Sequence, residues 1–324
     1  MSSQNKKETW DLLKLFFSAS YSQSYLNKCY QKESIAEKDV KSFENCYPFL
    51  YYLEHSKTYY DQAAIAPFSI QPILAFYGFI QLIKACLLTV DPVYPESTSV
   101  LAHGVTTRKR KKQQYEFLSD EIKIQKHGLL THFAEKMFHM KHLDGEKFSM
   151  RDLLKELPEM NQSFEFLTIN KNFQKMDYIM GEYHLPISVL NQFHMTSNRF
   201  NDFLKSKIPF DIDLKEGQTL SLLFDKKLSC NTNAPFRKDI KNDSFMLSLN
   251  KDSPCYVMPE LIIHYLILYN LSMIARYETE WWSELLKSMA NNDYPFIMQF
   301  LTITLEKGPY LILKWLTEDK FLTE

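Results

Sequence analysis

Apolar residues recur at helical spacing through the first part of the chain. Trp10 and Leu13 begin a row of this kind, which predicts one helix over residues 9–30. The same period returns over residues 44–63, where Pro48 is tolerated because first-turn N–H groups have no partner within a helix. We therefore expect two amphipathic helices at the amino-terminal end.

The segment 69–90 is apolar almost all round, which is typical of a helix buried at the centre of a helical core. It is also long enough to span a membrane, since a spanning helix needs about 20 mainly apolar residues. Gln71, Gln81 and Lys84 interrupt it, and a charge near the middle of a membrane span costs a few kcal/mol. Its flanks carry no aromatic or basic girdle, so we favour a core helix.

The centre of the chain mixes turns with shorter periodic patterns. Residues 91–112 are dense in turn residues and predict a loop. Residues 115–118 and 122–125 predict the two short strands of a hairpin, and helical spacing returns over residues 129–143.

Ser149 and Asp152 form a predicted capping pair for a short helix that ends before Pro158. The following stretch is less regular. Residues 187–208 have a helical period, whereas residues 220–224 and 244–249 alternate as strands do.

Beyond residue 258 the chain is again helical. Pro259 begins a long apolar run that ends at Tyr277. Pro295 and Pro309 each suit the first turn of a helix, the second just after Gly308 closes the preceding helix.

These patterns predict a mainly α protein, with a multi-helix core and a small β-hairpin or strand insertion. We expect residues 1–160 to form an N-terminal helical region with a basic loop and a hairpin. Residues 161–324 are expected to form a mixed middle segment and a C-terminal helical region, packed with the first region as one unit. Apolar residues make up 45% of the chain, which is enough for a substantial core, and only 7 of its 324 residues are glycine, which disfavours Gly-rich phosphate loops.

Charge and cysteine usage narrow the protein class. The chain has 38 Lys plus Arg against 39 Asp plus Glu, and a net charge of −1 is unlike a nucleic-acid coat protein. The 5 cysteines are widely spaced and form no CxxC motif, which fits a reducing cytosol. The amino terminus, MSSQNKKETWD, has no apolar secretory segment, so we expect a cytoplasmic protein.

Five consecutive cations lie on the predicted loop, and His103 and Gly104 precede them; they are Arg108, Lys109, Arg110, Lys111 and Lys112. This basic run attracts phosphates or an acidic protein surface, because Arg matches two oxygens of either group. The alternative is a solvated surface or a localisation signal. A nucleic-acid partner is less expected, because the run has no interleaved aromatic residues and no DNA-binding motif accompanies it.

Two further groups of residues have a chemical and a structural interpretation. His132, Glu135, His139 and His142 would share one face of a helix, and that face could hold a metal or simply be solvated. No HExxH motif is present, so we favour the solvated face and predict no metal site.

Arg276 ends the apolar C-terminal helix, and Tyr265, Tyr269 and Ser272 lie on the same face. A stripe of hydroxyls that leads to a guanidinium can bind an anion. The structural alternative, which we favour, is that Arg276 supports the helix end and pairs with a nearby acid such as Glu278.

The chain lacks the sequence motifs of common hydrolases, kinases and nucleotide-binding folds, so we predict no catalytic residue and no cofactor. The preferred hypothesis is a non-catalytic binding or regulatory protein that engages an acidic partner or an anionic ligand through the basic run, His103 and Arg276. The alternative is an enzyme on a phosphorylated or RNA substrate, with the basic run as phosphate clamp and His103 as acid or base. A third hypothesis makes Trp281 and Trp282 the interface of a scaffold.

The segments STSVLAHGVTTRKRKKQQYEFLSDEIKIQKHGLLTHF and LYNLSMIARYETEWW resemble the YaaC-like protein family, along nearly the whole chain. The resemblance implies a helical cytosolic protein, and it supplies no catalytic residue because the family has no established mechanism. Some relatives have proline where Thr279 stands here. Some are encoded beside inosine monophosphate dehydrogenase, which implies a nucleotide-metabolism enzyme or an anionic nucleotide as partner.

Overall fold

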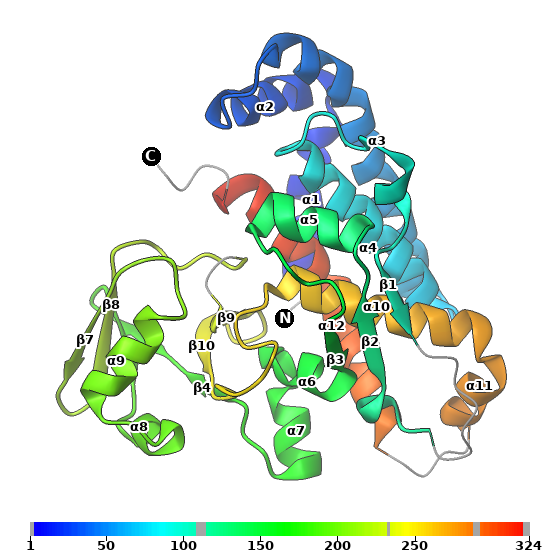
Figure 1. Cartoon of the computed structure of the whole chain (residues 1–324). Helices are drawn as coiled ribbons and strands as arrows, with labels where there is room; N and C mark the ends of the chain where they lie inside the picture. The colour runs from blue at the N-terminus through cyan, green and yellow to red at the C-terminus, as the bar shows by residue number, and fades with distance from the viewer. Residues whose placement is uncertain (1–2, 108–114, 232–233, 288–291, 320–324) are drawn as a thin grey trace.

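A computed structural model gives the fold of residues 3–107, 115–231, 234–287 and 292–319 (Figure 1). Over these residues the chain is mainly helical, as predicted, but ten strands in three antiparallel sheets make the β part larger than one small insertion. The helices are α1 (Ser3–Leu13), α2 (Ala19–Lys32), α3 (Lys38–Ile65), α4 (Gln71–Leu88), α5 (Leu129–Phe138), α6 (Met150–Lys155), α7 (Asn161–Thr168), α8 (Ser188–Phe193), α9 (Ser197–Lys205), α10 (Glu260–Tyr277), α11 (Thr279–Lys287) and α12 (Asp293–Lys314).

The three sheets have the strand orders β1-β2-β3, β4-β10-β9 and β5-β6-β8-β7. Their strands are β1 (Val105–Thr107), β2 (Glu121–Ile124), β3 (Lys147–Ser149), β4 (Phe173–Lys175), β5 (Asp177–Ile179), β6 (Glu182–Leu185), β7 (Ile212–Glu216), β8 (Leu220–Phe224), β9 (Phe236–Asp239) and β10 (Ser244–Ser248).

Helix α4 lies in the main core and packs against α3, α10 and α12. Phe76, Phe79 and Ile83 are fully buried there. Within the described residues α4 is the one helix long and apolar enough to cross a membrane, and 67% of it is buried inside the protein. The predicted core helix is therefore confirmed for this segment.

The predicted first helix over residues 9–30 is wrong in one respect, because the chain breaks at Ser18. A 3-10 turn over Lys14–Phe17 separates α1 from α2. Ser18 is extended, with ψ 118°, and its hydroxyl accepts a hydrogen bond from the backbone N–H of Tyr21 over 3.4 Å. Serine offers this bond at the start of a helix, which lets α2 begin as a separate helix.

The predicted hairpin at residues 115–125 is also wrong. Residues 117–119 form a 3-10 turn, and β2 pairs on one side with β1 and on the other with β3. Ile122 is buried opposite Thr107 and Phe148. The strand at 121–124 was therefore recognisable, but its partners come from outside the local sequence.

A second hydrophobic core lies in the middle of the chain. It joins the sheet β5-β6-β8-β7, helices α8 and α9 and parts of β9 and β10 into what we call the sheet lobe, residues 173–256 (Figure 1). Strand β8 spans the predicted residues, and Leu220 and Leu222 point into this core. The first and last parts of the chain share the other core, the helical body. The predicted helix over 187–208 is two helices, because the chain turns at His194, with φ 53°.

Helix α12 runs unbroken through Gly308 and Pro309, where the sequence predicted a helix end and a new start. A Cβ atom at Gly308 would lie 2.8 Å from the hydroxyl of Tyr60 and 3.3 Å from the ring of Phe79. The missing side chain thus allows α12 to approach α3 and α4 closely, and this packing outweighs the hydrogen bond that Pro309 cannot donate.

A buried ionic network joins the helical body to β9. Arg237 of β9 lies 3.2 Å from a carboxylate oxygen of Glu156, and Lys307 of α12 lies 2.7 Å from Glu159 and 2.6 Å from Glu260. All five side chains are buried. Three carboxylates therefore share two cations. Burial has the largest effect on the pKa of Glu260 and raises it to about 7, although the charge of Lys307 acts in the opposite direction.

Candidate functional site

The basic run, Arg108 to Lys112, lies outside the described residues. The nearest described residues on its two sides are Thr107 and Tyr115. Thr107 ends β1, and Tyr115 packs edge-on against Trp281 with ring centroids 4.6 Å apart. The other two predicted site residues are described: His103 lies just before β1, and Arg276 lies near the end of α10.

Arg276 is half-buried in the last turn of α10. Its guanidinium donates hydrogen bonds to the backbone carbonyl of Ser272 over 3.1 Å and to the hydroxyl of Tyr77 on α4 over 3.0 Å. It also lies over the rings of Tyr77 and Tyr277. These contacts hold the guanidinium at the end of α10 and join it to α4. The expected ion pair is not formed, because among the described residues no carboxylate lies within 4 Å of Arg276.

His103 lies just before β1 and packs against α10 beside Tyr269, two turns before Arg276. Its ring packs edge-on against Tyr269 and beside Phe76, with centroids 5.5 Å and 5.1 Å away. Its backbone carbonyl accepts a hydrogen bond from the hydroxyl of Tyr265 over 2.9 Å. Tyr265 and Tyr269 thus form the predicted row that leads to Arg276, and His103 packs against this row.

Burial is the main effect that lowers the pKa of His103, and the charges of Arg276 and Lys84 lower it further. The imidazole is therefore neutral at neutral pH. Among the described residues, the charges that act on it are those of two cations, so these residues make the potential at the ring positive.

Lys84 is the residue that sequence reasoning missed. It is half-buried on α4, and its ammonium lies 5.5 Å from the centre of the Tyr52 ring. Burial lowers the pKa of Lys84, and no carboxylate within the described part of the chain pairs with it. Tyr77, Gln81 and Lys84 recur four and three residues apart, so their spacing on an otherwise apolar helix was a usable signal.

We call this set of side chains the cationic stripe; it consists of Tyr77, Gln81 and Lys84 on α4, His103, and Tyr269 and Arg276 on α10. Within the described part of the chain, the buried side-chain oxygen of Gln81 makes no hydrogen bond. Lys84 and Arg276 are half-buried cations that no described carboxylate pairs with, and such groups are suited to hold an anion.

The predicted histidine face is not formed. Helix α5 ends at Phe138, and His139 and His142 both have a positive φ, 54° and 64°. His132 instead lies 2.8 Å from the buried carboxylate of Asp91. No set of three or more metal-ligating side chains comes together anywhere in the described ranges.

Trp282 is a packing anchor within the chain. It is 2% exposed, stacks on Phe68 at 5.4 Å and donates its N–H to the backbone carbonyl of Ser69 over 3.1 Å. Trp281 is partly buried against Tyr115. This packing leaves Trp282 without the exposed surface that a scaffold interface needs.

His103 has little of what an acid or base catalyst requires. A catalytic histidine is commonly oriented by a carboxylate, and its pKa lies near the working pH. In the described part of the chain no carboxylate contacts the His103 ring, and its pKa is lowered. The arrangement around it favours binding over proton transfer.

The comparisons with known proteins identify the family of this chain. No curated protein and no solved structure matches the chain. The family model described as YaaC-like Protein matches residues 14–316, which is nearly the whole chain. The chain therefore belongs to the YaaC-like protein family.

Proposed function

We propose that this chain is a non-catalytic binding protein that engages an acidic partner through the basic run and the cationic stripe. The observation that supports this proposal most directly is that Lys84 and Arg276 are half-buried and face no carboxylate in the described residues. Cations withdrawn from water without a counter-charge lower stability, so their presence calls for a function.

An acidic partner would supply the missing charge. The guanidinium of Arg276 is held by Ser272, Tyr77 and Met273, which accept from its Nε and both Nη groups. Among the described residues, one N–H of Nη1 is left to donate to an oxygen of a carboxylate or phosphate. Lys84 is free to approach the same group on its flexible stem. The five cations of the basic run, which follow His103 in the sequence by a few residues, would add long-range attraction.

The resemblance implies the cell compartment and the kind of partner. We propose a cytoplasmic protein that modulates an enzyme of purine-nucleotide metabolism, with inosine monophosphate dehydrogenase as the first enzyme to examine. Charge complementarity rather than a shared active site would be the basis of recognition.

The test is affinity capture of partners from native lysate of the source organism at low salt, followed by mass spectrometry. The bait variants reverse Arg108 to Lys112 to glutamate, or combine Lys84→Gln with Arg276→Gln. A matched control combines Lys28→Gln with Lys205→Gln, which removes the same charge from two exposed positions on α2 and α9.

The two test variants should lose the partner that the wild type and the control variant retain. Salt should weaken capture as well, because exposed charges are screened over about 8 Å at physiological ionic strength. Equal recovery of the same partner by all four baits would reject the proposal.

A further inference from the structure

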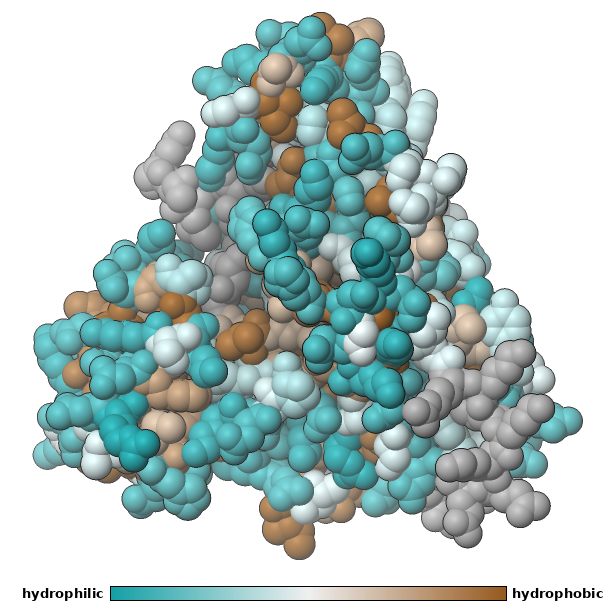
Figure 2. Space-filling view, in the orientation of Figure 1, coloured by the Kyte–Doolittle hydropathy of each residue, from teal (hydrophilic) through white to brown (hydrophobic). Residues whose placement is uncertain are grey.

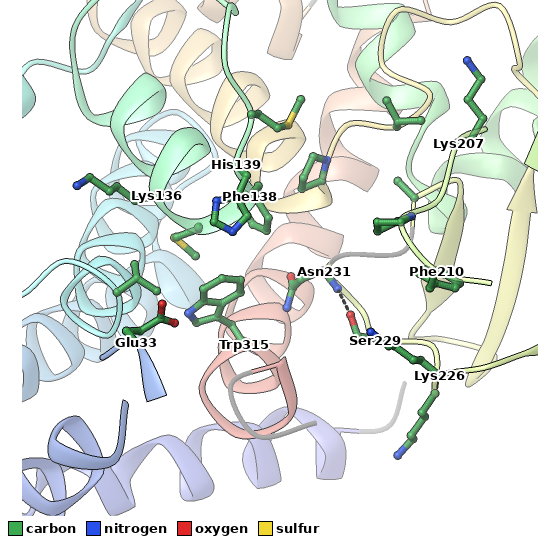
Figure 3. A pocket seen from close by; sticks show the side chains of 18 of the residues that line it. Glu33, Lys136, Phe138, His139, Lys207, Phe210, Lys226, Ser229, Asn231 and Trp315 are labelled. Carbon is green, nitrogen blue, oxygen red and sulfur yellow. Dashed lines mark hydrogen bonds between the residues drawn. The ribbon is translucent and has the colours of Figure 1, made fainter. Parts of the chain in front are cut away.

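A groove lies between the helical body and the sheet lobe. Its volume is about 840 Å³, within the range of about 300–1,000 Å³ that is typical of small-molecule sites. Figure 2 shows a recess between the two parts, and Figure 3 shows the groove from close by. Neither His103 nor Arg276 lines it, so this groove is separate from the cationic stripe.

The wall formed by the helical body is aromatic and nearly neutral. Phe138 packs edge-on against Trp315 with centroids 5.5 Å apart, and the indole N–H of Trp315 is held by the hydroxyl of Thr89 over 3.4 Å. The ring faces are thus fixed before any ligand binds. Lys136 on this wall lies 3.8 Å from the buried carboxylate of Asp91, which offsets its charge.

The wall formed by the sheet lobe is cationic. It carries Lys207, Lys226 and Lys227 against the single carboxylate of Asp225. Within the described ranges none of the three ammonium groups has a carboxylate within 4 Å. Lys207 instead lies 5.5 Å from the ring centre of Phe203. Figure 3 places Phe138 and Trp315 on one side of the groove, and Lys207 and Lys226 on the other.

We propose that this groove binds a small ligand that has a flat aromatic ring at one end and an anionic phosphate ester at the other. The ring would pack on Phe138 and Trp315, where apolar surface is already held rigid. The phosphate would face Lys226, Lys227 and Lys207, whose long stems let their ammonium groups converge on it. Because one wall is aromatic and the other is cationic, the ligand would bind in a single orientation.

The probe for the test is 8-anilinonaphthalene-1-sulfonate, which joins an aromatic body to an anionic group and fluoresces when shielded from water. Its affinity for the full chain is compared with that of N-phenyl-1-naphthylamine, which has the rings without the sulfonate. The test variant combines Lys226→Glu with Lys227→Glu. The matched control combines Lys205→Glu with Lys215→Glu, two exposed lysines of the same lobe that do not line the groove.

We expect one saturable site for the sulfonate probe, at least tenfold weaker in the Lys226 and Lys227 variant and within twofold of wild type in the control. The uncharged probe should bind both variants equally, and Phe138→Leu should weaken both probes. Phenyl phosphate should displace the sulfonate probe at concentrations where inorganic phosphate does not. An equal loss in the control variant, an unchanged affinity in the test variant, or displacement by inorganic phosphate alone would overturn the proposal.

Discussion

A hydrogen bond of 3.0 Å from the guanidinium of Arg276 to the hydroxyl of Tyr77 joins α10 to α4, two helical turns before Lys84. Because no described carboxylate neutralises either cation, this bond positions a positive charge without cancelling it. The same tyrosine ring also lies 5.7 Å from the guanidinium carbon, so it contacts the group through its face as well as its hydroxyl.

Tyr77→Phe removes that hydroxyl and keeps the ring. We expect a loss of stability of about 1.5 kcal/mol, the lower end of the net value of a hydrogen bond to a charged group. Affinity for an acidic peptide should fall several-fold, because Arg276 is no longer held in one rotamer. Urea unfolding and peptide binding measure the two effects, and a stability loss with unchanged affinity would assign Tyr77 to structure alone.

Lys84→Met should make the protein more stable at neutral pH. The wild-type ammonium is half-buried, its pKa is lowered by burial, and no described carboxylate pairs with it. Replacing it with an apolar side chain of similar length removes the desolvation penalty, and a gain of about 0.5 kcal/mol or more is expected. The midpoint of urea unfolding reports the gain. A lower midpoint would show that Lys84 has a stabilising partner.

Lys307→Met should be strongly destabilising, because it leaves Glu159 and Glu260 buried without their cation. Breaking a buried ion pair costs about 3–5 kcal/mol. The control is Lys314→Met on the same helix, where the lysine pairs with Glu318 near the surface and about 1 kcal/mol or less is expected. Similar losses in the two variants, compared by urea unfolding, would contradict the proposed importance of the buried network.

Because of Glu260, the free energy of unfolding should fall as pH rises through neutrality. Its pKa is raised from the ordinary value to about 7 in the folded state, mainly by burial, so folding favours its protonated form. This contribution is fully present below the unfolded pKa and is lost as pH rises through about 7.

Glu260→Gln mimics the protonated side chain at every pH. The free energy of unfolding of this variant should therefore rise relative to wild type between pH 5 and 8, by an amount on the order of 3 kcal/mol. Urea unfolding at several pH values gives the difference. A difference that does not change with pH would show that Glu260 stays ionised throughout.

Local signals in the sequence were sufficient for elements that depend on local physics. The Ser149 hydroxyl accepts a hydrogen bond from the Asp152 N–H over 3.1 Å at the start of α6, as the capping pattern predicted. Alternation over residues 220–224 located β8. Neither prediction required knowledge of the remainder of the chain.

Long-range contacts account for the errors and the omissions. The pairing of β2 with β1 and β3, and the passage of α12 through Pro309, depend on distant residues such as Phe148 and Tyr60. Arg276 and the tyrosines of α10 were recognised because they share one helix. Lys84 was missed because it approaches that stripe from α4, a helix nearly two hundred residues earlier in the chain.

The affinity of a fluorescein-labelled polyglutamate peptide, measured by anisotropy, tests the cationic stripe most directly. The wild type and the variant with Lys28→Gln and Lys205→Gln should bind it equally at low salt and more weakly at high salt. The variant with Lys84→Gln and Arg276→Gln, which leaves the basic run intact, should bind at least tenfold more weakly. Equal affinity in all three proteins would contradict a role for Lys84 and Arg276 in anion binding.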